Sequence, residues 1–187
     1  MEIRTFIAVD IPQNIKMELD KLIVGLRSLA PDIRWVRASN LHITLRFLGE
    51  IPQDSIASLE KSIEESIKDT NKFNISLTGI GGFPNLRRPR VIWVGVGDGN
   101  EKLMELADRV ESACRSAGFG QADKPFSSHL TIGRVKYPGG LERLISNIEK
   151  SDFSTASFEI PEAIIFKSDL LPSGPKYTRM AAISLKS

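Results

Sequence analysis

The spacing of apolar and polar positions divides the first half of the chain into alternating strands and helices. Short apolar runs rich in β-branched residues predict strands, and apolar residues at every third or fourth position predict amphipathic helices. Segment 41–47 alternates apolar and polar residues, which indicates a strand with one face in the core and with His42, Thr44 and Arg46 on the other. The predicted elements are strand 3–9, helix 15–26, strand 41–47, helix 56–67, strand 73–77 and a glycine-rich loop over 79–84.

The second half of the chain repeats the same order of elements. Its predicted elements are strand 91–96, helix 103–114, strand 130–135, helix 141–148 and strands 158–166 and 178–185. Several of these strands are not separated by helices. That arrangement favours the α+β class with antiparallel sheets over a parallel α/β fold.

A shift of 87 residues aligns the two halves. It superposes Phe6 on Trp93, the triplet 17–19 on 104–106, and the histidine strand 41–47 on the second histidine strand. We therefore expect one bilobal domain over 1–187, with repeat halves at approximately 1–86 and 87–187. The lobes should be related by a pseudo-twofold axis, each with an antiparallel sheet, flanking helices and one histidine facing a shared cleft.

Composition and charge are those of an ordinary globular protein. Hydrophobic residues make up 41% and charged residues 26% of the chain, and the formal net charge is +2. So small a net charge gives no general attraction to nucleic acid, and any RNA contact must therefore come from a local basic patch. The single Cys114 is expected in the core, as free cysteines usually are. No apolar run reaches the ~20 residues of a membrane span, and we expect a cytoplasmic monomer that binds no membrane.

The two histidines of the chain occur in the same short pattern. His42 and His129 are each followed by an apolar residue, a threonine and another apolar residue. On a strand, positions i and i+2 share a face, so each motif presents an imidazole beside a hydroxyl, Thr44 in the first and Thr131 in the second. Two imidazoles can act as acid and base near neutral pH, and threonine hydroxyls can donate to phosphate oxygens. The duplication favours this catalytic interpretation over two unrelated surface or core histidines.

Other chemistries lack their sequence patterns. Two histidines and one helical cysteine do not have the spacing of a zinc site, and neither a P-loop nor a nucleophile elbow is present, so we expect no metal and no cofactor. The basic run 87–90 is read as a solvated loop, with an RNA-backbone contact as the alternative. Five aromatic residues could stack on a base or belong to the core, and the sequence does not choose among Trp35, Phe47, Trp93, Phe126 and Tyr177.

Four ordered blocks give the chain a strong resemblance to a known family. RTFIAVDIP, NLHITLRFLGE, GGFPNLRRPRVIWVGV and KPFSSHLTIGR resemble the RNA 2′,3′-cyclic phosphodiesterases, formerly called 2′-5′ RNA ligases, of the 2H phosphoesterase superfamily. The resemblance implies a bilobal α+β fold and metal- and ATP-independent opening of a 2′,3′-cyclic phosphate to a 2′-phosphomonoester. It also implies weak, reversible 2′-5′ ligation of RNA, with tRNA fragments among the partners.

The resemblance also implies roles for individual residues. His42 would be the general acid that protonates the departing 3′-oxygen, and His129 the general base that activates water. Thr44 and Thr131 would hold phosphate oxygens, and Arg134 would bind the phosphate. Strict alternation places Arg134 on the face opposite His129, unless a bulge at Gly133 turns it inward. Two alternatives stay open: a related phosphoesterase for another cyclic or 2′-5′-linked diester, and a non-catalytic RNA-binding module.

Overall fold

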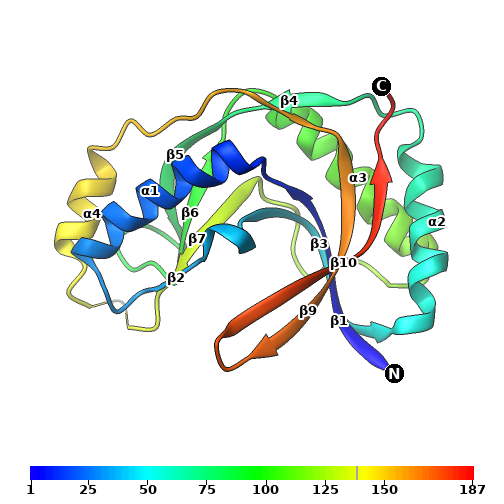
Figure 1. Ribbon diagram of the computed structural model, residues 1–187, viewed down its shortest axis with the longest axis horizontal. Helices are drawn as coiled ribbons and strands as arrows, with labels where there is room; N and C mark the ends of the chain where they lie inside the picture. Colours follow the sequence, from blue (N-terminus) through cyan, green and yellow to red (C-terminus); the bar gives the residue numbers. More distant parts are fainter. Residues whose placement is uncertain (138) are drawn as a thin grey trace.

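The structure is a computed structural model, and it describes residues 1–137 and 139–187 (Figure 1). The first half forms β1 (Glu2–Asp10), α1 (Gln13–Leu29), β2 (Arg34–Trp35), β3 (His42–Pro52), α2 (Ile56–Ile67), β4 (Phe73–Ile75) and β5 (Leu77–Phe83), with short 3-10 helices at Ala38–Asn40 and Gln53–Ser55. The second half forms β6 (Val91–Val96), α3 (Asn100–Ser116), β7 (His129–Arg134), α4 (Glu142–Glu149), β8 (Phe158–Ile160), β9 (Glu162–Leu171) and β10 (Gly174–Ser184).

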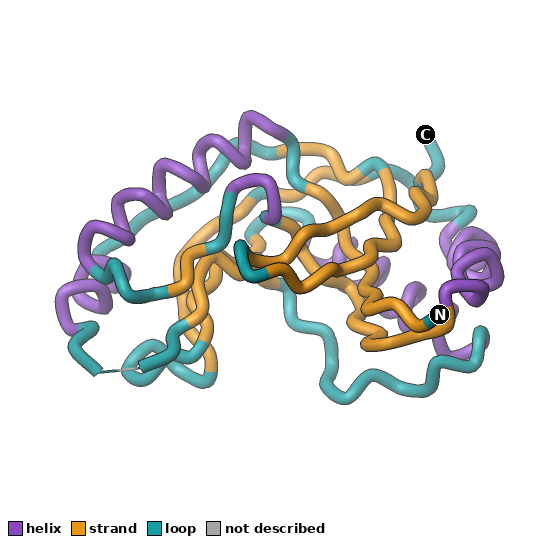
Figure 2. The backbone as a smooth tube through the Cα atoms, turned by 60° about the horizontal axis from the view of Figure 1, so that its bottom comes forward, coloured by secondary structure: helices purple, strands orange, loops and turns teal. Residues whose placement is uncertain are grey.

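The strands form two four-stranded sheets and one small two-stranded sheet. The first sheet has the order β10-β9-β1-β3, the second β2-β7-β6-β5, and β4 pairs with β8. Every pair within these sheets is antiparallel. The strands occupy the middle of the molecule; α1 runs from one end along the upper edge of this view, and α2 lies at the other end (Figure 2). The expected α+β class with antiparallel sheets is confirmed.

Each sheet is built from both halves of the chain. β5 leaves the first half to pair with β6, and β9 leaves the second half to pair with β1. The helices are exchanged as well, because α3 packs on β3 and against α2, while α1 contacts α4 beside the second sheet (Figure 1). This exchange joins the two halves through strand pairing as well as through side-chain packing.

The apolar stripes of the helices form the core together with the inner faces of the sheets. Their spacings of three and four residues bring the stripe of each helix to one face, where it is buried: Ile15, Leu19, Ile23 and Leu26 on α1; Ile56, Leu59, Ile63 and Ile67 on α2. Cys114 on α3 is fully buried, and burial raises the pKa of its thiol to about 12, which confirms its core position. None of the helices in the described part of the chain has the length and apolar character needed to cross a membrane.

Several sequence predictions about strands are wrong. The predicted strands 73–77 and 158–166 are each divided, the first between β4 and β5 and the second between β8 and β9. The glycine-rich stretch 79–84 is mostly strand, since β5 continues to Phe83 with a register shift beside Gly79. Glycine is needed there because a Cβ at Gly81 would lie 2.3 Å from Trp93 Cζ2. The last two strands are also longer than predicted toward their shared turn. β9 reaches Leu171 and β10 begins at Gly174, and this part of the hairpin has no apolar alternation because much of it is exposed.

Candidate active site

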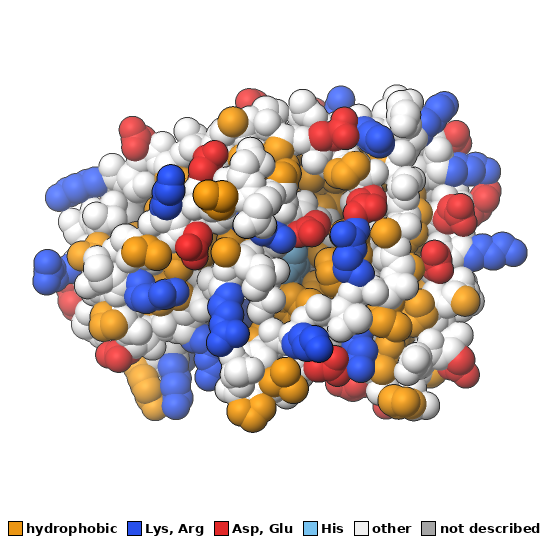
Figure 3. Space-filling model, in the orientation of Figure 1, with side chains coloured by type: hydrophobic (Ala, Val, Ile, Leu, Met, Phe, Trp, Pro, Cys, Tyr) orange, Lys and Arg blue, Asp and Glu red, His pale blue; other side chains and the backbone are white. Residues whose placement is uncertain are grey.

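His42 and His129 open the strands β3 and β7, and these strands contact each other across the two sheets. Both imidazoles, together with Thr44 and Thr131, line one cavity of about 800 Å³. The expectation that the two histidine motifs meet at one cleft is therefore met. A volume of this size is typical of pockets that bind small ligands. Figure 3 shows histidine surface at the bottom of a hollow on one face, surrounded by charged side chains.

The backbone fixes the same tautomer for both histidines. His42 Nδ1 lies 2.7 Å from the carbonyl oxygen of Asn40, and His129 Nδ1 lies 2.7 Å from that of Ser127. A carbonyl oxygen can only accept, so each Nδ1 carries the hydrogen and each Nε2 carries a lone pair in the neutral ring. Thr44 Oγ1 lies 3.0 Å from His42 Nε2; it donates to Nε2 of the neutral ring and accepts from Nε2 of the protonated ring. Each histidine thus presents Nε2 as its reactive nitrogen.

Aromatic rings pack against both imidazoles. The centroid of the Phe6 ring lies 4.8 Å from that of His42, and Tyr177 meets His42 edge-on at 5.2 Å. Phe83 meets His129 edge-on at 5.0 Å. Burial lowers the pKa of both histidines, because it disfavours the charged imidazolium. Burial likewise raises the pKa of the Tyr177 hydroxyl.

A β-bulge in β7 decides where Arg134 points. In the pairing with β6, Gly133 faces Ile92 and Thr131 faces Trp93, so Ile132 has no partner. The extra residue reverses the alternation beyond it. Arg134 therefore lies on the same face as His129 and lines the same cavity. The bulge that the sequence left open at Gly133 is present one residue earlier.

The same bulge occurs at the equivalent place in β3. Leu45, which is 87 residues before Ile132, has no partner on β1, because Thr44 pairs with Ala8 and Arg46 with Ile7. Strict alternation over 41–47 is therefore wrong beyond Thr44. Arg46 turns away from the cavity and is buried, with its Nε 3.1 Å from Glu111 Oε2 on α3.

The residue that replaces Arg46 on the cavity face is Phe47, the equivalent of Arg134 in the first half. Its ring is about half exposed, and the Arg4 guanidinium lies 4.6 Å from the ring centroid. Trp35 and Tyr177 also line the cavity, whereas Trp93 and Phe126 line a different one. Three of the five candidate stacking residues are thus brought to the site.

The cavity is strongly basic, although the chain is nearly neutral. Four arginines and no carboxylate are among the described residues that line it; the arginines are Arg4, Arg34, Arg37 and Arg134. Only Arg134 was predicted, because the others come from β1, β2 and the segment before β3, and no sequence spacing connects them. The basic run 87–90 does not line this cavity. Arg87, Arg88 and Arg90 are exposed, in agreement with the predicted solvated loop, and the basic patch of the cavity is formed by other residues.

The chain matches known phosphoesterases over nearly its full length. The family model described as LigT like Phosphoesterase matches twice, at residues 9–93 and 94–177, which confirms the duplication. The chain is 31% identical over 186 residues to an RNA 2′,3′-cyclic phosphodiesterase of Methanothermobacter thermautotrophicus, covering 99% of this chain and 100% of the relative. It is 36% identical over 175 residues to the enzyme of that name from Methanocaldococcus jannaschii, covering 93% and 96%.

Solved structures of similar proteins also match the chain over nearly its full length. The crystal structure of Escherichia coli LigT complexed with 3′-AMP aligns with a TM-score of 0.74 and 26% identity, covering 100% of both chains. A Thermus thermophilus protein aligns with a TM-score of 0.79 and 25% identity, covering 98% of both chains. With its two family matches, its full-length relatives and its paired histidine strands, this chain belongs to the LigT-like phosphoesterase family.

Proposed function

We propose that this protein hydrolyses RNA 2′,3′-cyclic phosphate ends to 2′-phosphomonoesters. The relatives' names supply the substrate class. The observation that carries the proposal is the placement of both histidine motifs in one cavity that is lined by arginines and by no carboxylate of the described residues. Such a cavity attracts a phosphodiester anion and offers two imidazole Nε2 atoms to it.

The reaction requires one proton to be removed and one to be supplied. His129 Nε2 accepts a proton from water while the water oxygen attacks phosphorus. The bond from phosphorus to the ribose 3′-oxygen breaks, and His42 Nε2, protonated beforehand, donates its proton to that oxygen. The products are a 2′-phosphomonoester and a free 3′-hydroxyl, and the histidines have exchanged protonation states. Each Nδ1 remains bonded to its carbonyl throughout, so neither ring has to turn.

The charges around the two rings support this assignment of acid and base. The carboxylate of Asp10, which is paired with His42 in the β1–β3 register, favours the imidazolium form of His42. Lys16 and Arg134 act on His42 in the opposite direction. Arg134 also favours the neutral form of His129, and no carboxylate of the described residues opposes it there. Burial lowers the pKa of both rings, and the Asp10 carboxylate beside His42 is the one charge that opposes it, which supports His42 as the proton donor and His129 as the acceptor.

The remaining cavity residues are proposed to hold the phosphate. Thr44 and Thr131 can donate to its non-bridging oxygens, whose negative charge grows as water attacks. Arg134 can donate two parallel hydrogen bonds to the same group. We propose that no metal takes part. In support, no three His, Cys, Asp or Glu side chains come together as a metal site within residues 1–137 and 139–187.

The test is turnover of a short RNA that ends in a 2′,3′-cyclic phosphate, with EDTA present and no nucleotide added. The expected product carries a 2′-phosphate. His42→Ala and His129→Ala should each lose about 10²–10⁴ in rate, the usual contribution of general acid or base catalysis. A phosphodiester with a nitrophenol leaving group should restore His42→Ala but not His129→Ala, because nitrophenolate leaves without a proton. A metal requirement, a 3′-phosphate product or equal restoration of both variants would contradict the proposal, and binding without turnover would indicate an RNA-binding module.

A further inference from the structure

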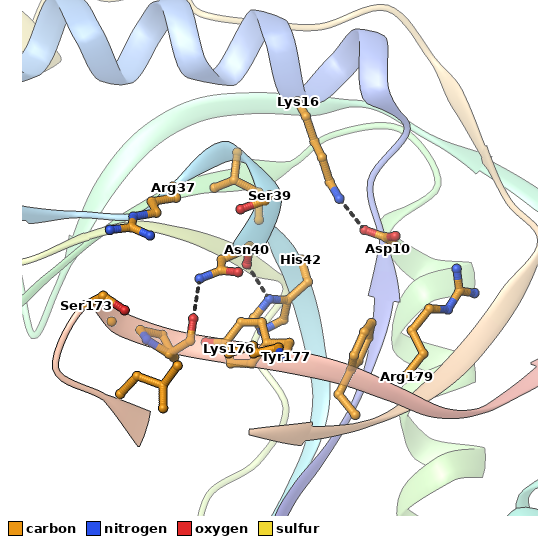
Figure 4. Close-up of a pocket in the computed structure, with 15 residues that line it drawn as sticks. Asp10, Lys16, Arg37, Ser39, Asn40, His42, Ser173, Lys176, Tyr177 and Arg179 are labelled. Carbon is orange, nitrogen blue, oxygen red and sulfur yellow. Dashed lines mark hydrogen bonds and ion pairs between the residues drawn. The ribbon is translucent and has the colours of Figure 1, made fainter. Parts of the chain in front are cut away.

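A second cavity lies on the other side of the His42 ring. Its volume is about 530 Å³, and its floor and walls come from α1, the segment 37–42 and the start of β10 (Figure 4). Asp10, Lys16, Lys176 and Arg179 line it and do not line the first cavity, whereas His42 lines both. A group bound in the second cavity would thus be a direct neighbour of a group bound at the histidine pair.

The two cavities adjoin along residues that line both of them, among them Arg37, Asn40 and Pro175. Asn40 Nδ2 donates to the carbonyl oxygen of Pro175 at 2.9 Å, and the carbonyl oxygen of Asn40 accepts from His42 Nδ1 (Figure 4). The same residue therefore orients the imidazole and lies where the two cavities adjoin, so one continuous ligand can reach both.

The second cavity carries more positive charge than its own carboxylate can balance. Lys16 Nζ lies 2.7 Å from Asp10 Oδ1, which neutralises this pair, and Arg179 is paired with Glu162. Arg37 and Lys176 have no carboxylate within ion-pair distance among the described residues. Two mostly exposed cations beside the cavity are thus available for an anion.

A third cavity, of about 540 Å³ and near His129 in the sequence, has a different character. It is lined by Ser127, Phe126, Trp93 and Met104 but not by His129 itself. No charged side chain lines it among the residues that the structure describes. The two cavities therefore differ: the cavity beside His42 favours an anion, and the cavity near Ser127 does not.

We propose that the second cavity binds the phosphodiester that joins the terminal nucleotide of the RNA to the nucleotide before it. This inference rests on the proposed function, in which His42 protonates the ribose 3′-oxygen and the terminal ribose therefore lies next to His42. The preceding phosphate is attached to the 5′-oxygen of that same ribose. Arg37 and Lys176 in the second cavity provide a site for this phosphate. The upstream RNA chain runs along the start of β10. His129 is left facing the attacking water.

The test compares three substrates that differ only upstream of the cyclic phosphate. They are a nucleoside 2′,3′-cyclic phosphate, the same compound with a 5′-phosphate, and a dinucleotide that ends in the cyclic phosphate. In the wild type, kcat/KM should be higher for the two substrates that carry the upstream phosphate. Lys176→Met should reduce this preference about five- to tenfold, the size expected for one partly exposed charged contact. The matched control Lys61→Met, an exposed lysine on α2, should leave the preference unchanged.

Three outcomes would contradict the proposed subsite. If Lys176→Met lowers kcat/KM equally for all three substrates, the cavity affects catalysis and not the upstream phosphate. If only the dinucleotide is preferred by the wild type, the upstream base or ribose is recognised instead. If the preference survives in the double variant R37Q/K176M, which removes both available cations, the phosphate lies elsewhere. Failure of the wild type to hydrolyse any of the three substrates would instead overturn the proposed function itself.

Discussion

Replacing Arg134 by glutamine removes a permanent charge from the catalytic cavity and preserves much of the side-chain shape. Arg134 lines the cavity beside His129 because of the bulge at Ile132. Hydrogen bonds to charged groups contribute about 1.5–3 kcal/mol, and each 1.4 kcal/mol corresponds to a factor of ten. Three other arginines remain in the cavity. We therefore expect kcat/KM to fall about ten- to 100-fold. This loss is smaller than the loss of about 10²–10⁴ expected for either histidine variant.

The same substitution has a second effect with a definite sign. Burial is the main cause that lowers the pKa of His42 and His129, and the nearby Arg134 cation lowers both further. Without that cation, the imidazolium form costs less and both pKa values rise. The acidic limb of the kcat/KM profile, set by the base, and the alkaline limb, set by the acid, should therefore both move to higher pH.

The assay is a pH–rate profile of wild type and Arg134→Gln, combined with NMR titration of the imidazole protons. The chain has only two histidines, so both resonances can be followed without overlap. Arg27→Gln is the matched control, because Arg27 is exposed in the last turn of α1 and lines neither cavity. Full activity of Arg134→Gln, or a fall in either histidine pKa, would refute the argument that the bulge directs this arginine into the catalytic site.

Three further substitutions or treatments test other parts of the structure. Asp10→Asn removes the carboxylate that favours protonated His42, so the alkaline limb of the kcat/KM profile should move to lower pH; an unmoved or raised limb would contradict the assignment of the acid. Gly133→Val should lower stability by about 1–3 kcal/mol, since even a Cβ would lie 3.0 Å from the Trp35 ring, and urea unfolding measures this. Cys114, with its raised pKa, should resist iodoacetamide until the protein unfolds, and rapid labelling of the native protein would place the thiol outside the core.

Many elements of the fold and several site residues could be predicted from local sequence patterns. The period-two and helical spacings located the histidine strands and the long helices, because one face of each element must be buried whatever its neighbours are. The duplication was visible for a similar reason, since both halves repeat the same order of elements around His42 and His129. The threonines followed from strand geometry, because positions i and i+2 share a face until a bulge intervenes.

Tertiary structure decided the direction of the side chains beyond the threonines. The unpaired Leu45 and Ile132 reverse the alternation, turn Arg46 into the core and bring Phe47 and Arg134 to the cavity. Period-two reasoning cannot detect a bulge, because the extra residue is defined by the register of the partner strand and not by its own sequence.

The basic character of the site was also decided by tertiary structure. The net charge of +2 gave no sign of it, since the cavity collects Arg4, Arg34 and Arg37 from separate segments of the chain. The exchange of β5 and β9 between the halves brings both sheets together around those segments. Charge density at a site depends on which segments meet in space, and that is a property of the fold and not of composition.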